Sequence, residues 1–278
     1  MKFELRKEFI EHIQSLIEEQ SITKITEQLA EIHAADIAEI YEAIELEKAH
    51  FLHNIIEDEK GADILMELED DLRDQLLDKL SPKEIAEEVL ENLESDDAAD
   101  IVSELPQEVK EEVLSHIEDV EHASDIADLL NYPEDTAGGL MAKELIKVNK
   151  NWTVMRCVRE MRKQAENVSF VYTIYVVDDK DILVGTLSLK KLLLTDAKTI
   201  ISKIYKEDII MINANEDNEE VGNIMNKYDL IVLPVVNDLG QLMGRITVDD
   251  VMEVIKEEAE KDYQMASGIS EDVESSDS

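Results

Sequence analysis

The chain has 278 residues, with 67 Asp and Glu against 27 Lys and Arg, which gives a formal net charge of −40 at pH 7. This sign excludes nucleic acid as an expected partner, because phosphate binding needs a positive surface; divalent cations or basic proteins fit better. Apolar residues make up 44%, so the chain can bury real cores and is not a disordered acidic tail.

Residues 1–131 predict an acidic, all-helical domain, because glycine is almost absent and apolar residues recur at helical spacing. A phrase made of a small residue, Asp and Ile recurs four times in this part. The four copies are HAADIAEI at 33–40, KGADILMEL at 60–68, DDAADIVSEL at 96–105 and EHASDIADLL at 121–130. The recurrence predicts short helix pairs stacked as a superhelical solenoid.

The character of the sequence changes at TAGGLM, 136–141, after which β-branched residues dominate. We predict a hinge over residues 132–142, where the Gly138-Gly139 pair would permit a swing between domains.

The second half contains an internal repeat. YVVDDKDILVGTLSLKKLL, 175–193, aligns without gaps on PVVNDLGQLMGRITVDDVM, 234–252, and each copy is preceded by a helical stretch, 152–164 or 215–229. The pattern predicts two units of the order helix, strand, turn, strand, helix, with turns at 178–181 and 237–240. We place the units at 143–203 and 204–258.

The last predicted helix is strongly acidic: ITVDDVMEVIKEEAEKD, 246–262, carries seven carboxylates. At 100° per residue, Asp249, Asp250 and several glutamates fall on one face, and Val251, Met252, Val254 and Ile255 fall on the other. ESDDAAD in the helical domain places Asp96 and Asp100 on one helix face as well. Mg²⁺ prefers carboxylate and water oxygens, so two such surfaces should separate without cations and dock with them. The alternative is that both faces are merely solvated.

The repeat resembles a tandem pair of CBS domains, a Bateman module. Together with YPEDTAGGLM, YDLIVLPVV, GRITVDDV and EEAEKD, the chain looks like the cytosolic portion of MgtE-type magnesium transporters. The resemblance implies no enzyme activity, a homodimer formed through the CBS domains, and a position on the cytoplasmic face of the membrane. It also implies an intracellular Mg²⁺ sensor that closes a transmembrane pore domain absent here, with residues 259–278 as the connecting helix and tail.

The resemblance also implies which acids bind Mg²⁺. In this sequence they fall on Asp63, Asp96, Asp100, Asp217, Glu219, Asp229, Asp250, Glu253, Glu258 and Asp262. Lys261 stands where an acid would be expected, so one site near the membrane is lost or shifted.

Two other functions remain open. CBS pairs often bind adenine nucleotides through Ser/Thr-x-x-Asp, and Thr247 with Asp250 fits that pattern, whereas Ser188 with Lys191 lacks the acid. The acidic solenoid could also serve as a scaffold for a basic protein.

Several features point away from other chemistry. The single cysteine, Cys157, allows no intramolecular disulfide and is expected to be buried and inert. His50 and His53 are spaced to share a metal, but no cysteine or second pair supports a zinc site. The N-terminus is not a signal peptide, and no stretch reaches the ~18 apolar residues of a membrane span, so we expect the chain as given to be soluble.

Overall fold

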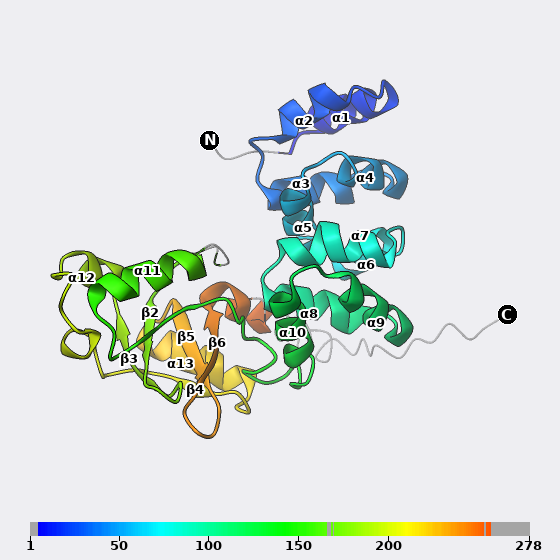
Figure 1. Ribbon diagram of the computed structural model, residues 1–278. Coiled ribbons are helices and arrows are strands. Elements are labelled where there is room, and N and C mark those ends of the chain that lie inside the picture. Colours follow the sequence, from blue (N-terminus) through cyan, green and yellow to red (C-terminus); the bar gives the residue numbers. More distant parts are fainter. Residues whose placement is uncertain (1–4, 166–167, 169, 253, 257–278) are drawn as a thin grey trace. The chain divides into compact units, whose positions relative to one another are not determined.

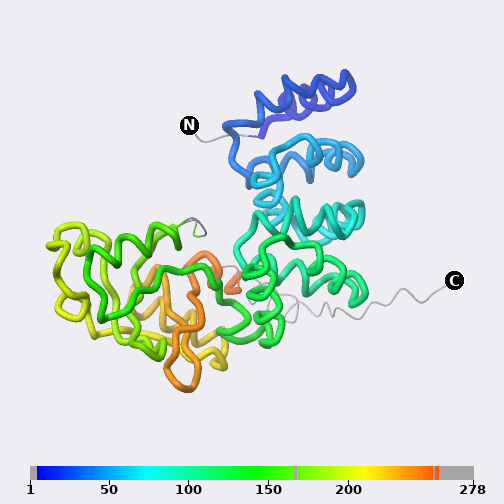
Figure 2. The backbone as a smooth tube through the Cα atoms, viewed as in Figure 1, coloured from blue at the N-terminus to red at the C-terminus, as the bar shows by residue number. Residues whose placement is uncertain are grey.

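The computed structural model describes residues 5–165, 168, 170–252 and 254–256 (Figures 1 and 2). It divides into two compact units, Met1–Asp128 and Leu129–Ser278. Each unit has its own core, and they are described separately below.

The first unit is entirely helical over its described residues. Its helices are α1 (Lys7–Glu18), α2 (Ile22–Leu29), α3 (Ala34–Glu42), α4 (Leu46–His53), α5 (Asp58–Met66), α6 (Asp70–Leu77), α7 (Pro82–Glu84), α8 (Ser95–Glu104), α9 (Gln107–His116) and α10 (Val120–Leu129). A π-helical turn, Ile85–Val89, and a 3-10 turn, Leu90–Asn92, continue α7. Helix α1 contacts α2 and α4, α3 contacts α4 and α5, α4 contacts α6, and α7 contacts α9, which is the stacking that the sequence predicts.

The recurring phrase of the sequence is the repeated core element of this unit. Its four copies form α3, α5, α8 and α10. The isoleucine of each copy is at most 1% exposed; these residues are Ile37, Ile64, Ile101 and Ile126. In the first three copies a buried alanine precedes the isoleucine, namely Ala34, Ala62 and Ala99, and its small side chain permits close packing.

The second unit contains two small mixed sheets. The first, in the order β1-β2-β3, consists of Ile146–Asn149, Ile174–Val177 and Leu183–Leu187, and the second, in the order β4-β5-β6, consists of Ile212–Asn213, Val232–Val236 and Leu242–Thr247. In each sheet the first pair of strands is parallel and the second pair antiparallel. Helices α11 (Val154–Gln164) and α13 (Asn218–Tyr228) provide the parallel crossovers, and α12 (Leu189–Leu193) follows β3.

The predicted order of helix, strand, turn, strand and helix is confirmed in both copies of the internal repeat. The structure adds one strand before the first helix of each copy, β1 and β4. Sequence reasoning missed these two strands because they are short and lie outside the gapless part of the repeat.

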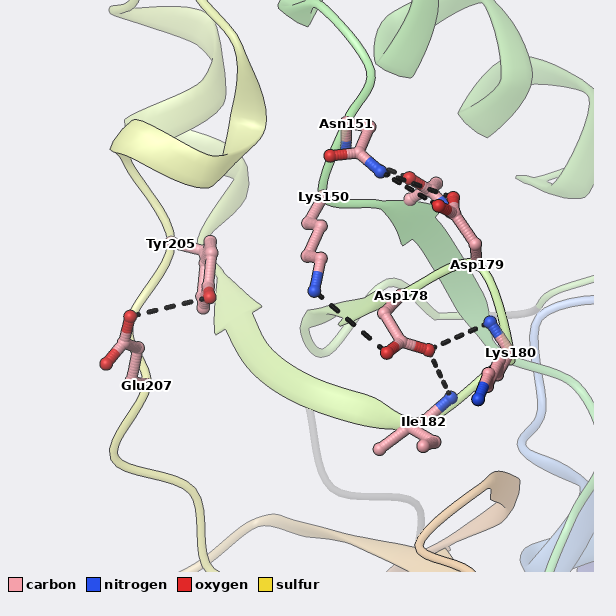
Figure 3. Close-up of polar contacts among 9 residues, drawn as sticks. Lys150, Asn151, Asp178, Asp179, Lys180, Ile182, Tyr205 and Glu207 are labelled. Carbon is pink, nitrogen blue, oxygen red and sulfur yellow. Dashed lines mark hydrogen bonds and ion pairs between the residues drawn. The ribbon is translucent and has the colours of Figure 1, made fainter.

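The two hairpin turns are equivalent down to single hydrogen bonds. Asp178 Oδ1 accepts from the amides of Lys180 at 2.9 Å and Ile182 at 3.2 Å, and these bonds, the Lys180 bond foremost, hold the pKa of Asp178 below its usual range (Figure 3). Asn237 Oδ1 accepts from the amides of Leu239 and Gln241 in the same way, each at 3.0 Å.

The matching turn positions also adopt left-handed backbone, with φ of 59° at Asp181 and 76° at Gly240. The turns bond to each other, because Leu183 N donates to Gly240 O and Leu242 N donates to Asp181 O. The repeat is therefore a pseudo-twofold pair joined at its turns.

The TAGGLM segment is bound into this second unit. Ala137 N donates to Glu216 O and Gly138 N to Ala214 O, both at 2.8 Å, and Thr136 pairs with Asp217. A Cβ on Gly139 would lie 2.6 Å from the Pro133 carbonyl oxygen, and one on Gly138 would lie 2.2 Å from the Tyr132 ring. The two glycines thus permit close packing within the second unit, and the hinge over residues 132–142 stays a prediction.

A mutation at Gly139 can distinguish close packing from backbone flexibility as the reason for this glycine. Replacing Gly139 by alanine should lower the free energy of unfolding by about 1–3 kcal/mol, because the new methyl group meets backbone that cannot move aside. Gly222→Ala is the matched control. It lies within α13 with Val251 Cγ1 at an ordinary 3.5 Å, so a helix-propensity gain of about 0.5–1 kcal/mol is expected. Urea denaturation measures the free energy of unfolding of both variants. An unchanged value for Gly139→Ala would support a flexible hinge instead.

Candidate functional site

The negative charge is distributed unevenly along the chain. Residues 1–128 contain 39 Asp and Glu against 10 Lys and Arg, and residues 204–258 contain 13 against 4. Residues 143–203 reverse the balance, with 7 acids against 12 bases. The helical unit therefore carries most of the chain's excess negative charge and of the self-repulsion that it causes.

Three of the ten predicted cation-binding acids lie in the helical unit. Asp63, in α5, is exposed, and partial burial followed by the charge of Glu59 raises its pKa. Asp100 is exposed in the middle of α8, but Asp96, one turn earlier, is only 8% exposed and accepts a hydrogen bond from Asp97 N at 3.0 Å. The pair expected on one solvent face is thus split between a buried and an exposed position.

Three more acids lie at the two ends of α13. Asp217 caps its N-terminus, where its side chain accepts from Glu219 N at 2.9 Å, and Glu219 lies in the first turn. Asp229 follows the last turn in the left-handed conformation, with φ of 51°. Eleven helical residues span about 16 Å, so Asp229 cannot share one ion with Asp217 and Glu219 of the same chain.

Asp250 has a structural role that the acidic-strip interpretation did not anticipate. Residues 248–252 and 254–256 are helical, and Asp250 Oδ2 accepts from both Thr247 N at 2.7 Å and Thr247 Oγ1 at 2.8 Å. Desolvation by burial raises the pKa of Asp250 despite these bonds. The carboxylate therefore caps the start of the helix and is half-buried, whereas Met252, assigned to the packed face, is 61% exposed.

The same bonds bear on the nucleotide motif. Thr247 is 2% exposed and its hydroxyl is engaged by Asp250, so in this structure the two motif residues satisfy each other. The last three predicted acids, Glu253, Glu258 and Asp262, lie outside the described residues, as do Lys261 and the tail 259–278. Within the described ranges, no three His, Cys, Asp or Glu side chains gather closely enough to hold a metal ion.

A small cavity in the second unit is lined by Leu145, Ile146, Phe170, Tyr172, Thr173, Tyr175 and Arg245. Arg245 is 4% exposed, donates from Nε to Glu144 O at 2.7 Å and lies 5.3 Å from the centre of the Tyr172 ring. The Tyr175 hydroxyl is buried and finds no hydrogen-bond partner among the described residues. The sequence signal that marks this cavity is an arginine inside an otherwise apolar strand.

Comparison with known proteins identifies both units. The MgtE intracellular N domain matches residues 32–135, and the CBS domain matches 137–198 and 201–257. A solved structure described as the cytosolic domain of the Mg²⁺ channel MgtE in complex with ATP superposes with a TM-score of 0.80 at 32% identity, covering 88% of this chain and 99% of that one. The chain belongs to the MgtE family.

Other MgtE matches extend over nearly the whole chain. The soluble part of a magnesium transporter superposes with a TM-score of 0.79 at 28% identity, covering 91% of this chain and 99% of that one. The magnesium transporters MgtE of Thermus thermophilus and Bacillus subtilis are 33% and 30% identical over 92% and 96% of the chain. The chain spans only 57% and 58% of those two relatives.

These matches confirm the predicted fold class and the resemblance to the cytosolic region of MgtE transporters. The curated relatives from Thermus thermophilus, Enterococcus faecalis and Bacillus subtilis are each described as a magnesium transporter MgtE. Among the residues that the structure describes, none of the helices has both the length and the apolar character needed to cross a bilayer.

The expected inert residues are also located. Cys157 is fully buried, its Sγ lies 3.8 Å from Met161 Sδ, and burial raises its pKa to about 11. His53 is 7% exposed, and burial lowers its pKa to about 4, so it is neutral at pH 7. The structure gives neither residue the surroundings of a nucleophile or a metal ligand.

The capping role of Asp250 can be measured without any ligand. Asp250→Ala should lower the free energy of unfolding by about 1–2 kcal/mol, because the Thr247 amide and hydroxyl lose their acceptor. Asp249→Ala, at the exposed neighbouring position, should change it by less than about 0.5 kcal/mol. Urea denaturation in a Mg²⁺-free buffer compares them, and equal effects would show that Asp250 is not a cap.

Proposed function

We propose that this region senses intracellular Mg²⁺ and gates a magnesium transporter, with bridging ions docking the helical unit onto the CBS units and favouring a closed pore. The observation that carries the proposal is the distribution of acids. Residues 1–128 and 204–258 both have a large acidic excess, yet no described group of acids could hold an ion by itself. The ions would then be held between surfaces and not within one.

The electrostatics favour this arrangement. Two carboxylates 4 Å apart repel by roughly 4 kcal/mol at an effective dielectric of about 20, and a hydrated divalent cation between them reverses the sign. Mg²⁺ usually keeps several waters and needs only one or two carboxylates. Because a ligand biases an equilibrium only through its differential affinity, the strongest sites would exist only in the docked form.

The proposed ligands are the ten acids that the family resemblance implies. The exposed members, Asp63, Asp100, Asp217, Glu219 and Asp229, are accessible to hydrated ions. Asp96 and Asp250 are more buried, so they would bind an ion only from one side or act through their neighbours. The spacing along α13 requires at least two separate ions for its three acids.

We further propose a homodimer formed through the CBS domains. The CBS unit exposes large apolar side chains at the end of α12 and on the helical residues 248–252 and 254–256. Leu193 and Leu194 are 69% and 77% exposed, and Met252 and Ile255 are 61% and 48% exposed. A second copy of the chain would cover such residues in a symmetric interface.

Charge reversal in the helical unit tests the bridging role. Asp100→Lys should dock the units at lower Mg²⁺ than the wild type needs, because an ammonium group takes over part of the cation's role. Glu121→Lys adds the same charge at another exposed position of this unit, outside the ten proposed ligands, and should shift the midpoint less.

The midpoint can be measured from the rate at which a protease cleaves the chain around residues 129–135 during a Mg²⁺ titration. Identical midpoints for wild type and Asp100→Lys would contradict the assignment of Asp100 as a bridging ligand.

A second candidate function, adenine-nucleotide binding, is favoured by the cavity. The ring centroids of Tyr172 and Phe170 lie 6.0 Å apart with their planes tilted by 49°, Arg245 adds a positive charge to the lining, and the buried Tyr175 hydroxyl offers a donor to a hydrogen-bonding ligand. One related structure is described as an ATP complex. We propose that a nucleotide would use this cavity rather than depend on Thr247, whose hydroxyl is already engaged.

Calorimetry with ATP distinguishes the two locations. Tyr172→Ala should weaken binding by about 5- to 150-fold, since a lost stacking contact is worth about 1–3 kcal/mol. Tyr228→Ala removes an exposed tyrosine elsewhere in the CBS unit and should leave the affinity unchanged. Strong loss in Thr247→Ala with none in Tyr172→Ala would place the nucleotide at the Thr-x-x-Asp motif.

A further inference from the structure

His53 is a buried titratable group that the proposed function does not use. It is the last residue of α4, and its side chain is 7% exposed. The buried arginines Arg73 and Arg245 donate hydrogen bonds to Asp70 and to the Glu144 carbonyl, both within 2.8 Å. His53 Nδ1, by contrast, finds no hydrogen-bond partner among the described residues. The ring is therefore packed in the unit as a neutral group with one bare nitrogen.

Helix α5 closes the space beside this nitrogen. A Cβ on Gly61 would lie 3.3 Å from His53 Cε1 and 3.6 Å from His53 Nδ1, so the imidazole lies against the backbone of α5. Gly61 is the only glycine of residues 1–128 and is itself buried. Its amide is already engaged, because it donates to Glu57 O at 2.8 Å. The edge of the ring that carries Nδ1 thus meets helix backbone and not water.

Few charges act on the ring. On α4 itself, His50 is half-buried one turn before His53, and on α5 Asp58 is exposed in the first turn. Burial is the largest influence on the pKa of His53 and lowers it; the charge of His50 lowers it further, and that of Asp58 raises it. From α1, α3 and α6, the described helices that pack on α4, no charged group shifts this pKa. A proton on Nδ1 would have no described acceptor.

Protonation changes what the buried site must satisfy. Neutral imidazole has one N–H and one bare nitrogen, whereas imidazolium has two N–H donors and a full charge, which need partners or water. Burial accordingly lowers the pKa of His53 from 6.5 to about 4. Because an exposed ring takes up the proton more readily, the stability supplied by the neutral ring is complete above pH 6.5 and is lost as the pH falls toward 4.

We propose that His53 is an acid-sensitive latch of the helical unit, whose protonation releases the ring from Gly61 and opens the packing of α4 on α5. The released ring has a favourable place to go. His53 ends α4, where the partial negative charge of a helix C-terminus stabilises a cation, and Asp58 begins the next helix. The open form therefore supplies the counter-charge that the closed form lacks.

Protons and not Mg²⁺ act on this latch, which goes beyond the proposed function. None of its residues belongs to the ten proposed Mg²⁺ ligands. Opening of this kind is local, so acidification would loosen α4 and α5 while the other helices keep their packing. The helical unit would then respond to two cations, the proton and Mg²⁺, through different residues.

Some carboxyl groups of the same unit respond to acid in the opposite direction. Burial raises the pKa of Glu88 and of Glu104, so the folded unit takes up protons at these groups more readily than the unfolded chain. Their contribution to stability therefore increases as the pH falls. For this reason the effect of His53 has to be measured as a difference between variants.

Hydrogen–deuterium exchange of the full 278-residue chain, in Mg²⁺-free buffer, measures the opening in peptides that span residues 46–66. After correction for intrinsic exchange rates, protection of the wild type should fall about 30-fold between pH 7.5 and pH 5.0, the factor that a pKa of 6.5 in the open form and about 4 in the closed form gives.

Two variants in α4 supply the matched comparison. His53→Phe fills the site with a ring that cannot be protonated, so its protection should change by less than about threefold over the same pH range. His50→Gln removes the half-buried histidine of the same helix and should keep the loss seen in the wild type.

A titration of the wild type keeps the test valid if His53→Phe does not fold. The chain has six histidines, and with ¹³C-labelled histidine the Cε1–H resonance of His53 can be assigned through its contact with Gly61. This resonance should remain that of neutral imidazole down to about pH 5. Titration near pH 6.5 would overturn the latch.

The exchange data give three further ways to overturn it. Equal losses of protection in wild type and His53→Phe would assign the acid response to other groups. Unchanged protection in the wild type would show that no opening follows acidification. A parallel loss in residues 146–187 would show unfolding of the whole chain and not a local opening. Because Mg²⁺ is absent throughout, none of these results depends on whether the region senses Mg²⁺.

Discussion

Repulsion among carboxylates is the constraint on which the rest of this molecule depends. The helical unit folds despite having 39 acids, because its cores are built from isoleucines and leucines that are almost fully removed from water. The acids occupy helix surfaces and first turns, where the helix dipole favours them. The repulsion among the acids therefore acts at the surface of the unit. It opposes the approach of any other acidic surface, and cations weaken it.

The two halves of the CBS unit carry net charges of opposite sign. Its pseudo-twofold pair of sheets is joined through equivalent turns, yet the first half is basic and the second acidic. Backbone geometry is conserved between the halves while surface charge is not. One fold thus carries a predominantly basic half and a predominantly acidic half.

Much of the fold could be predicted from the sequence, because hydrophobic periodicity and gapless repetition report directly on packing. The four small-Asp-Ile phrases became four core helices, and the two aligned segments became equivalent hairpins. The short strands β1 and β4 left too little pattern to detect. The glycines at 138 and 139 were read as flexible because sequence cannot show that the Tyr132 ring and the Pro133 carbonyl fill the space beside them.

The site was less predictable for a physical reason. Helical phase gives the direction of a side chain but not what covers it, so Asp96 and Asp250 were expected among exposed acids and are instead buried or half-buried. The Thr247–Asp250 pair illustrates the difficulty, because the same Thr-x-x-Asp spacing serves a helix cap and a ribose site. The aromatic and arginine residues of the cavity carried no motif and emerged only when β2 and β6 brought them together.

The central claim is that Mg²⁺ acts by bringing two acidic bodies together, and small-angle X-ray scattering over a Mg²⁺ titration tests it most directly. Ionic strength is held constant with K⁺, so that general screening is removed from the comparison. The account predicts a cooperative fall in the radius of gyration at constant dimer mass. A radius of gyration that follows the K⁺ control throughout would contradict it and would leave the carboxylates as a solvated surface.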